Sequence, residues 1–215
     1  MSFVIAIDGP AASGKSSVSR VLAEKLNALF VNSGAMYRAV TWAALEAGID
    51  PTDAATVAAW VPTLEITCGS ENRRSTISIN GLDPEPFIRD PRVNQSVSNI
   101  SAVPEVRRIL VEKLRSYAQL GNVVMEGRDI GSVVFPETPH KFYIDASEEV
   151  RARRRSDQGE TDSIAKRDAQ DSTRKTAPLK VSEDAVVIDS SEMNLAEVVA
   201  AVLPHLSAHG LNVAP

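Results

Sequence analysis

Short apolar runs recur along the chain, and a polar or charged residue stands at or just after the end of each. Runs of this length, bounded in this way, are typical of buried strands. The runs are FVIAI (3–7), ALFVN (28–32), NVVME (122–126), KFYID (141–145) and AVVID (185–189). A helix-like or charged segment follows each run. This alternation predicts an α/β fold with a parallel five-stranded sheet flanked by helices.

Three of the intervening segments have a clear helical pattern. Residues 15–26 place apolar side chains on one stripe, and residues 33–48 do the same before Gly48, which is a stop signal. Residues 104–121 begin with Pro104, which suits the first position of a helix. We therefore expect helices to cover the predicted sheet.

One region departs from this pattern. Residues 63–69 and 75–81 alternate with a period of two, and Asn80-Gly81 is a strong turn signal. The proline-rich segment that follows disfavours a helix. The predicted division is a core of residues 1–61 and 93–215 with a small β-rich insertion at residues 62–92.

Composition and charge exclude several classes of protein. The net charge is −5 and the pI is about 5.3, so the chain has no overall basic field to attract long nucleic acid. The single Cys68 rules out an internal disulfide framework and suits a reducing cytoplasm. We also expect no signal peptide and no membrane span, which favours a cytoplasmic protein.

The segment GPAASGKSS matches the phosphate-loop pattern G-x-x-x-x-G-K-[ST], between a predicted strand and a predicted helix. Backbone N–H groups of such a loop surround phosphates, and the helix N-terminus adds partial positive charge. Lys15 would reach the β- and γ-phosphates, and Ser16 would bind Mg²⁺. The alternative is a plain glycine turn. The predicted ATP-binding residues are Gly9, Pro10, Ala11, Ala12, Ser13, Gly14, Lys15, Ser16 and Ser17.

Arginines follow at places where a second ligand could bind. Arg38 lies in NSGAMYR, where Asn32 or Ser33 can cap the helix. At the carboxyl edge of a sheet its planar fork could hold a phosphate. An isolated arginine at such a position is more often a surface charge.

Two later segments carry further arginines. In KRDAQDSTRKTAPL, residues Arg167, Asp171 and Arg174 have the spacing of one helical face, which also fits a ladder of surface ion pairs. In VRARRR, three arginines share a face if the segment is helical, and SDQGETDS after them is polar enough for a lid. We predict a short lid at residues 151–166, although a solvated face fits the arginines too.

The segment VVMEGRDIG places Arg128 and Asp129 side by side at the end of a predicted buried strand. Such charges mark either a solvated turn or the mouth of a site. Ligands of open parallel sheets collect at this edge, which favours a site.

Four segments in order, GPAASGKSS, NSGAMYR, GRDIGSVVFP and RDxxDxxR…APL, resemble the bacterial cytidylate kinases over nearly the whole chain. The resemblance implies a P-loop enzyme that transfers phosphate from ATP, with Mg²⁺, to CMP and dCMP, and we expect this enzyme to be a monomer. The segment after residue 151 is shorter than in many members. The implied CMP-binding residues are Ser33, Arg38, Ser98, Arg107, Arg128, Asp129, Arg167, Asp171 and Arg174, and the implied catalytic residues are Lys15, Arg128, Arg154 and Arg155.

Within this resemblance, Arg38, Arg128 and Arg174 correspond to the arginines that bind the acceptor phosphate. Ser98, Arg107 and Asp129 correspond to the residues that recognise cytosine. Arg167 and Asp171 correspond to the pair that holds the ribose.

The chemistry of the bases explains why a carboxylate suits residue 129. The cytosine amine donates to a carboxylate, whereas uracil presents a carbonyl that leaves the carboxylate unpaired. Two rival functions stay open at this point: a P-loop kinase with another acceptor, such as UMP, another deoxynucleotide or a non-nucleotide, and a regulatory NTPase that needs a macromolecular partner.

Overall fold

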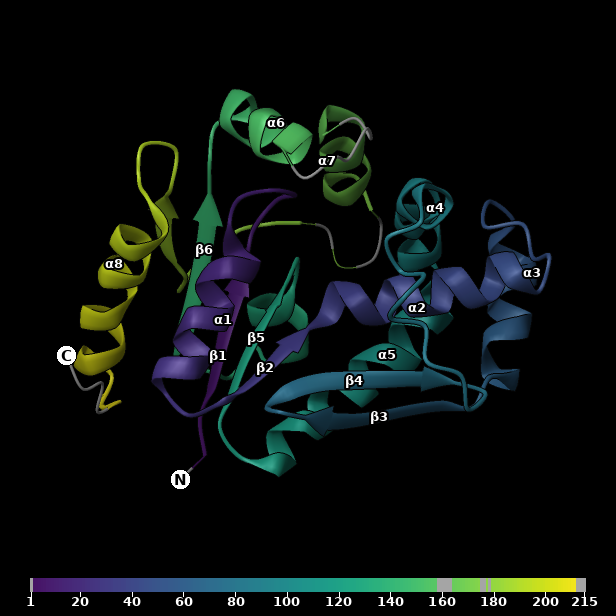
Figure 1. Ribbon diagram of the computed structural model, residues 1–215, viewed down its shortest axis with the longest axis horizontal. Coiled ribbons are helices and arrows are strands. Elements are labelled where there is room, and N and C mark those ends of the chain that lie inside the picture. The colour runs from purple at the N-terminus through teal and green to yellow at the C-terminus, as the bar shows by residue number, and fades with distance from the viewer. Residues whose placement is uncertain (1, 158–163, 175–176, 178, 212–215) are drawn as a thin grey trace.

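The computed structural model describes residues 2–157, 164–174, 177 and 179–211 (Figure 1). Its strands are β1 (Val4–Asp8), β2 (Leu29–Asn32), β3 (Ile66–Glu71), β4 (Arg74–Ile79), β5 (Val123–Gly127), β6 (His140–Asp145) and β7 (Val186–Asp189). Its α-helices are α1 (Lys15–Lys25), α2 (Ser33–Glu46), α3 (Ala54–Trp60), α4 (Pro91–Ala102), α5 (Pro104–Ser116), α6 (Glu148–Asp157), α7 (Ile164–Ser172) and α8 (Leu195–Ala208).

The strands form one sheet with the order β3-β4-β2-β5-β1-β6-β7. Five neighbouring strands of this order are parallel to one another: β2, β5, β1, β6 and β7. The strands β3 and β4 form an antiparallel hairpin at one end of the sheet. The hairpin joins the parallel part through a single residue pair, Phe30 with Arg74. The carboxyl ends of the parallel strands therefore lie at a common edge, toward α6 and α7 (Figure 1).

Alternate residues of the central strands pack on opposite faces of the sheet. Val123 and Met125 belong to a core with α2, α3, α4 and α5, whereas Val124 belongs to a core with α1 and α8. All five residues of β5 are buried, which explains its almost continuous apolar sequence. Packing against a different core on each face restrains the register of the strand that ends at Gly127.

Polar residues cap the helices that support the site. The Asn32 side chain accepts a hydrogen bond from the Ala35 N–H at 3.0 Å and caps α2. The Asp90 side chain accepts from the Arg92 N–H at 2.8 Å and caps α4, which begins at Pro91. Within the described residues, no helix combines the length and apolarity that crossing a membrane requires.

The predicted α/β class, with a parallel sheet covered by helices on both faces, is confirmed. The sheet is larger than the predicted five strands because the hairpin at residues 66–79 extends it. The helix predicted at residues 104–121 ends at Ser116 and continues as a 3-10 turn. We did not predict α3 or α4 from the sequence. The division into core and insertion at residue 62 stays a prediction.

The packing of α5 in the core gives a first test. Leu110 on α5 is 0% exposed, whereas Leu120, just after the same helix, is 62% exposed. Leu110→Ala should lower the free energy of unfolding by about 2–5 kcal/mol because it leaves a cavity, and Leu120→Ala should change it by less than about 0.5 kcal/mol. Urea unfolding of both variants measures the difference. Equal losses would show that α5 does not pack as described.

Candidate active site

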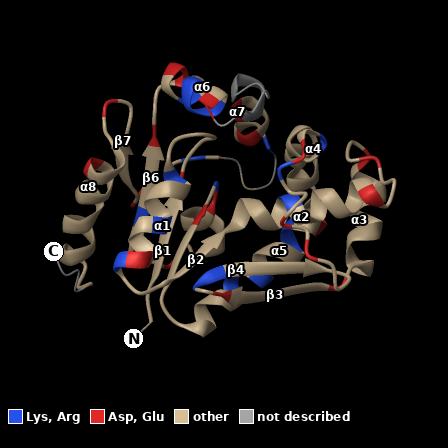
Figure 2. Cartoon of the chain, in the orientation of Figure 1, with Lys and Arg blue, Asp and Glu red and all other residues tan. Residues whose placement is uncertain are grey.

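A cleft of about 1220 Å³ opens at the carboxyl edge of the sheet, between the loop after β1 and the segments around α2, α4 and the hairpin. The pairing of Asp8 with Gly127 and of Asn32 with Glu126 places the ends of β1, β2 and β5 together at its floor. Basic residues lie on α6 and at the start of β4 (Figure 2). The cleft has the size and setting of a ligand site.

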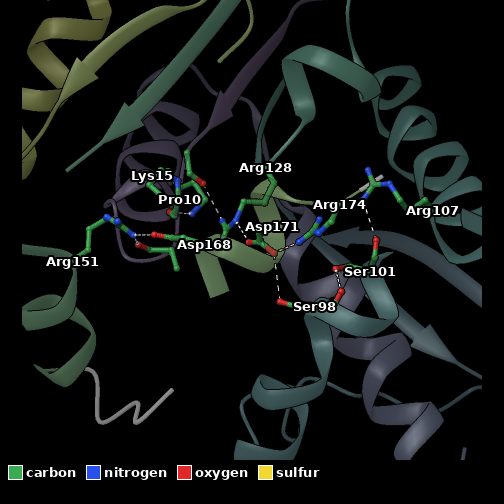
Figure 3. Close-up of polar contacts among 12 residues, drawn as sticks. Pro10, Lys15, Ser98, Ser101, Arg107, Arg128, Arg151, Asp168, Asp171 and Arg174 are labelled. Carbon is green, nitrogen blue, oxygen red and sulfur yellow. Dashed lines mark hydrogen bonds and ion pairs between the residues drawn. The ribbon is translucent and has the colours of Figure 1, made fainter. Parts of the chain in front are cut away.

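The phosphate loop lies at one end of this cleft. Gly14 adopts a left-handed conformation (φ 92°), and α1 begins at Lys15, so the N-terminus of α1 faces the loop. The Lys15 Nζ donates to the Pro10 carbonyl at 2.8 Å (Figure 3). A Cβ on Gly9 would lie 2.1 Å from the Ile144 carbonyl oxygen, so only glycine fits where β1 enters the loop. The predicted succession of strand, glycine-containing loop and helix is therefore present.

Glu126 is a functional candidate that we did not identify from the sequence. The Ser16 Oγ donates to the Glu126 Oε1 at 2.6 Å, and the Glu126 side chain is buried. Glu126 is the second-last residue of β5, the strand beside β1. Its position at the end of a buried strand was the only sequence feature that could have identified it. A hydroxyl and a carboxylate are oxygen ligands of the kind Mg²⁺ prefers, with phosphates and water completing its shell. Within the described residues, no three or more His, Cys, Asp or Glu side chains lie close enough together to hold a metal ion.

Arginines of α6 lie against the phosphate loop. The Arg154 guanidinium donates to the Ser13 carbonyl at 3.3 Å and to the Ser190 carbonyl at 2.8 Å. The Arg151 guanidinium donates to the Ala11 carbonyl at 3.4 Å and pairs with Asp168 at 2.5 Å. Arg155 is buried and lines the cleft. The face of α6 that carries these arginines is therefore turned toward the loop. The alternative prediction of a solvated face is wrong.

A carboxylate shared by two arginines lines the cleft (Figure 3). The Arg128 Nε donates to the Asp171 Oδ2 at 2.8 Å, and Arg174 pairs with the Oδ1 of the same carboxylate. The Ser98 Oγ lies 3.4 Å from that Oδ1, and the Arg128 Nη1 donates to the Gly9 carbonyl at 3.1 Å. Arg128 thus connects the phosphate loop to the cluster, as its position at the end of β5 suggested.

A second buried ion pair lies beside this cluster. Arg107 on α5 pairs with Asp129, and both side chains are at most 5% exposed. Burial raises the pKa of the Asp129 carboxyl, and the nearby cations Arg107 and Arg174 act against that shift. Within the described residues, the buried Tyr37 hydroxyl and the Arg174 Nε have no hydrogen-bond partner. These polar atoms are suited to a ligand that enters the cleft.

The remaining predicted residues lie at the edge of the cluster or outside the description. The Ser33 Oγ donates to the Glu126 carbonyl at 2.8 Å, and the Arg38 Nε donates to the Asn94 side chain at 3.4 Å. Arg174 lies two residues beyond the end of α7, so the predicted helical face does not continue to it. The side chain of Arg167 and the predicted lid residues 158–163 lie outside the described part of the chain.

A parallel sheet with a phosphate loop, an arginine-rich cleft beside it and arginines over the loop defines a phosphoryl-transfer enzyme of the P-loop kinase class. The family model for cytidylate kinase matches residues 5–208. This chain belongs to the cytidylate kinase family, which confirms the family predicted from the four motifs.

Named relatives agree with this assignment. The chain is 44% identical over 206 residues to the cytidylate kinase of Clostridium botulinum (strain Loch Maree / Type A3), covering 91% of this chain and 93% of that one. It is 47% identical over 209 residues to the cytidylate kinase of Mycobacterium leprae (strain Br4923), covering 92% of each. Among solved structures, the Deinococcus radiodurans tunicamycin resistance protein has a TM-score of 0.51 at 15% identity, covering 100% of this chain and 99% of that chain, and shares the fold alone.

The carboxyl of Asp8, just before the phosphate loop, has an unusual pKa. Burial raises this pKa from its ordinary value of 3.8 to about 7, and the N–H groups of Gly131 and Ile130 oppose the shift only in part. Asp129 nearby adds to the rise, and Lys15 lowers the pKa. The neutral carboxyl is therefore favoured more in the folded protein than in the unfolded chain.

This shift predicts how stability depends on pH. Because the folded pKa of Asp8 lies above its ordinary value, its contribution to stability is full below about pH 4 and is lost as pH rises through about 7. The free energy of unfolding of the wild-type protein should therefore fall relative to that of Asp8→Asn between about pH 4.5 and about pH 8. Urea unfolding at several pH values measures this difference. A difference that grows in favour of the wild type with rising pH would contradict the assignment.

Proposed function

We propose that this protein transfers the γ-phosphoryl group of ATP to CMP and dCMP. The observation that carries the proposal is that the phosphate loop and the Arg128–Asp171–Arg174 cluster face one cleft, joined by the bond from Arg128 to the Gly9 carbonyl. A donor on the loop and an acceptor on the cluster would therefore meet near Arg128. Membership of the cytidylate kinase family supports this pairing of substrates.

In this proposal ATP binds the loop of residues 9–17, and Lys15 contacts its terminal phosphates. Ser16 and Glu126 would hold Mg²⁺, which neutralises phosphate charge when it is bound. The Lys15 ammonium would then exchange its hydrogen bond to the Pro10 carbonyl for hydrogen bonds to phosphate oxygens. Arg154 and Arg155 on α6 would add positive charge around the transferred group, where negative charge develops in the transition state.

The acceptor phosphate is proposed to bind among Arg38, Arg128 and Arg174. Their guanidinium groups would place a phosphate oxygen of the monophosphate in line with the γ-phosphorus of ATP. Asp171 and Arg167 would hold the ribose. Catalysis then consists of positioning and charge stabilisation, with no covalent intermediate on the protein.

Recognition of cytosine is proposed for Asp129, with Arg107 and Ser98 beside it. The Asp129 carboxylate would accept from the exocyclic amine, and the guanidinium of Arg107 would donate to the acceptors of the base. Burial of the Arg107–Asp129 pair supports this role, because a buried carboxylate that faces a uracil carbonyl stays unmatched.

The organisation of the molecule follows from the same proposal. Residues 62–92 would form the acceptor-binding insertion, residues 151–166 the lid, and the rest the core. The described residues that line the cleft all belong to one chain, which is compatible with the proposed monomer. The lone Cys68 and the nucleotide substrates support a cytoplasmic location.

A coupled assay with CMP, dCMP, UMP, AMP and GMP tests the function, and Asp129→Asn tests the base recognition. The wild type should prefer the two cytidine nucleotides. Asp129→Asn should reduce kcat/KM for CMP and narrow the gap to UMP by about 1–3 kcal/mol, because its amide can donate to a carbonyl. Equal losses for CMP and UMP would remove Asp129 from base recognition, and a preference for another monophosphate would refute the proposed substrate.

The Mg²⁺ site is tested with Glu126→Gln, which keeps the shape of the side chain and removes its charge. This variant should need roughly tenfold more Mg²⁺ for half-maximal activity, since loss of a metal-orienting carboxylate weakens binding by about that factor. Glu105→Gln, which alters an exposed pair with Arg108, is the matched control. An unchanged Mg²⁺ requirement in Glu126→Gln would exclude this role.

A further inference from the structure

One π-helical turn, Ile130–Val134, follows directly after Asp129. It connects the end of β5 to the segment that leads into β6. The Asp129 backbone has φ −151° and ψ 28° where the turn begins, so the orientation of the turn sets the direction of the Asp129 side chain. Residues outside the cleft hold this turn at both ends.

The carboxylate of Asp8 holds the beginning of the turn. Its Oδ1 accepts from the Ile130 N–H at 2.7 Å, and its Oδ2 accepts from the Gly131 N–H at 2.8 Å. Asp8 is the last residue of β1, it is 5% exposed, and it pairs with Gly127 in the sheet. The strand that enters the phosphate loop therefore also fixes the backbone directly after Asp129.

The guanidinium of Arg115 holds the other end. Its Nη2 donates to the Val133 carbonyl at 2.8 Å, and its Nε donates to the Val134 carbonyl at 2.9 Å. Arg115 and Arg107 lie on the same helix, α5, and Arg107 contacts Asp129 directly. One helix therefore holds both the carboxylate of Asp129 and the turn behind it.

Close packing leaves the turn little room between these two anchors. A Cβ on Gly131 would lie 3.1 Å from the Lys141 Cγ and 3.4 Å from the Asp8 Oδ2. Lys141 itself is held by Asp184 and by the Pro136 carbonyl, each at 2.6 Å. The turn is thus fixed on three sides by β1, β6 and α5.

We propose that Asp8 and Arg115 are positioning residues for pyrimidine selection. By holding the two ends of the 130–134 turn, they fix the direction in which Asp129 presents its carboxylate to the base. This inference rests on the proposed role of Asp129 in recognising cytosine. Neither residue touches the substrate, and each acts through the backbone of the turn. A site of this kind loses selectivity when its supporting groups relax by a fraction of an ångström.

Asp8→Asn tests the first anchor. The amide keeps the shape of the carboxylate, but its NH₂ group faces one of the two N–H donors and cannot accept from it. The CMP-to-UMP ratio of kcat/KM should fall by roughly tenfold at about pH 8, which lies above the raised pKa of the wild-type carboxyl. The KM for ATP and the Mg²⁺ concentration for half-maximal activity should stay unchanged.

Arg115→Ala tests the second anchor from a different element and does not disturb the strand before the phosphate loop. The CMP-to-UMP ratio of kcat/KM should fall by about threefold. This change is smaller than the one expected for Asp8→Asn because water can replace the guanidinium at this exposed end of the turn. Arg108→Ala is the matched control, since Arg108 is an exposed arginine of the same helix that pairs with Glu105. Its ratio should equal that of the wild type.

The outcomes separate the alternatives. Equal losses for CMP and UMP in both variants would indicate a purely structural role and overturn the inference. A higher Mg²⁺ requirement with an unchanged ratio in Asp8→Asn would assign Asp8 to the metal shell instead. If Asp8→Asn does not fold, Arg115→Ala decides, and an unchanged ratio there overturns the proposal.

Asp129→Asn in the same assay distinguishes this inference from the proposed function. If Asp129→Asn lowers the ratio while both positioning variants keep it, only the inference fails. If the wild type does not discriminate between CMP and UMP, the proposed base recognition fails and the inference fails with it.

Discussion

The parallel pairing of β1 with β5 is the constraint on which the candidate site depends. It places Asp8, the residue before the phosphate loop, opposite Gly127, the residue before Arg128. The segments proposed to bind the phosphate donor and the acceptor are more than a hundred positions apart in the sequence, yet they begin at the same level of one sheet edge. Both strands are almost wholly buried, so a shift by one residue would exchange the side chains that pack into the two cores. The hydrophobic core thus fixes the geometry of the polar cleft.

Arginine side chains are concentrated in the cleft, although the chain as a whole is acidic. The chain has a net charge of −5, yet Arg107, Arg128 and Arg174 gather around two buried carboxylates. Taking such pairs out of water costs several kcal/mol per ion, and this is rarely a route to greater stability. Their concentration at one strand edge is better explained by ligand binding, because perturbed and buried charges gather at functional sites.

The sequence predicted the strands well because burial on both faces leaves nearly continuous apolar runs. It also located the phosphate loop and the Arg128–Asp129 pair, since each follows such a run. It did not show that the hairpin extends the sheet, because that depends on one long-range pair, Phe30 with Arg74. It also missed Glu126, which resembles any strand-end carboxylate until β5 is placed beside β1. Long-range pairing decides both features, and local pattern carries no signal of it.

The carboxylate of Asp171, which two arginines share, has a thermodynamic consequence. A phosphate that binds here, as proposed, would compete for the two arginines with an anion already in place. Binding would then be an ion exchange, and the measured affinity would be the difference between the affinities of the arginines for phosphate and for Asp171. The resident carboxylate would keep the cations in a compact, pre-formed arrangement and would also weaken the binding of the product. Both effects would favour turnover, because arginines without a resident anion would release a bound phosphate slowly.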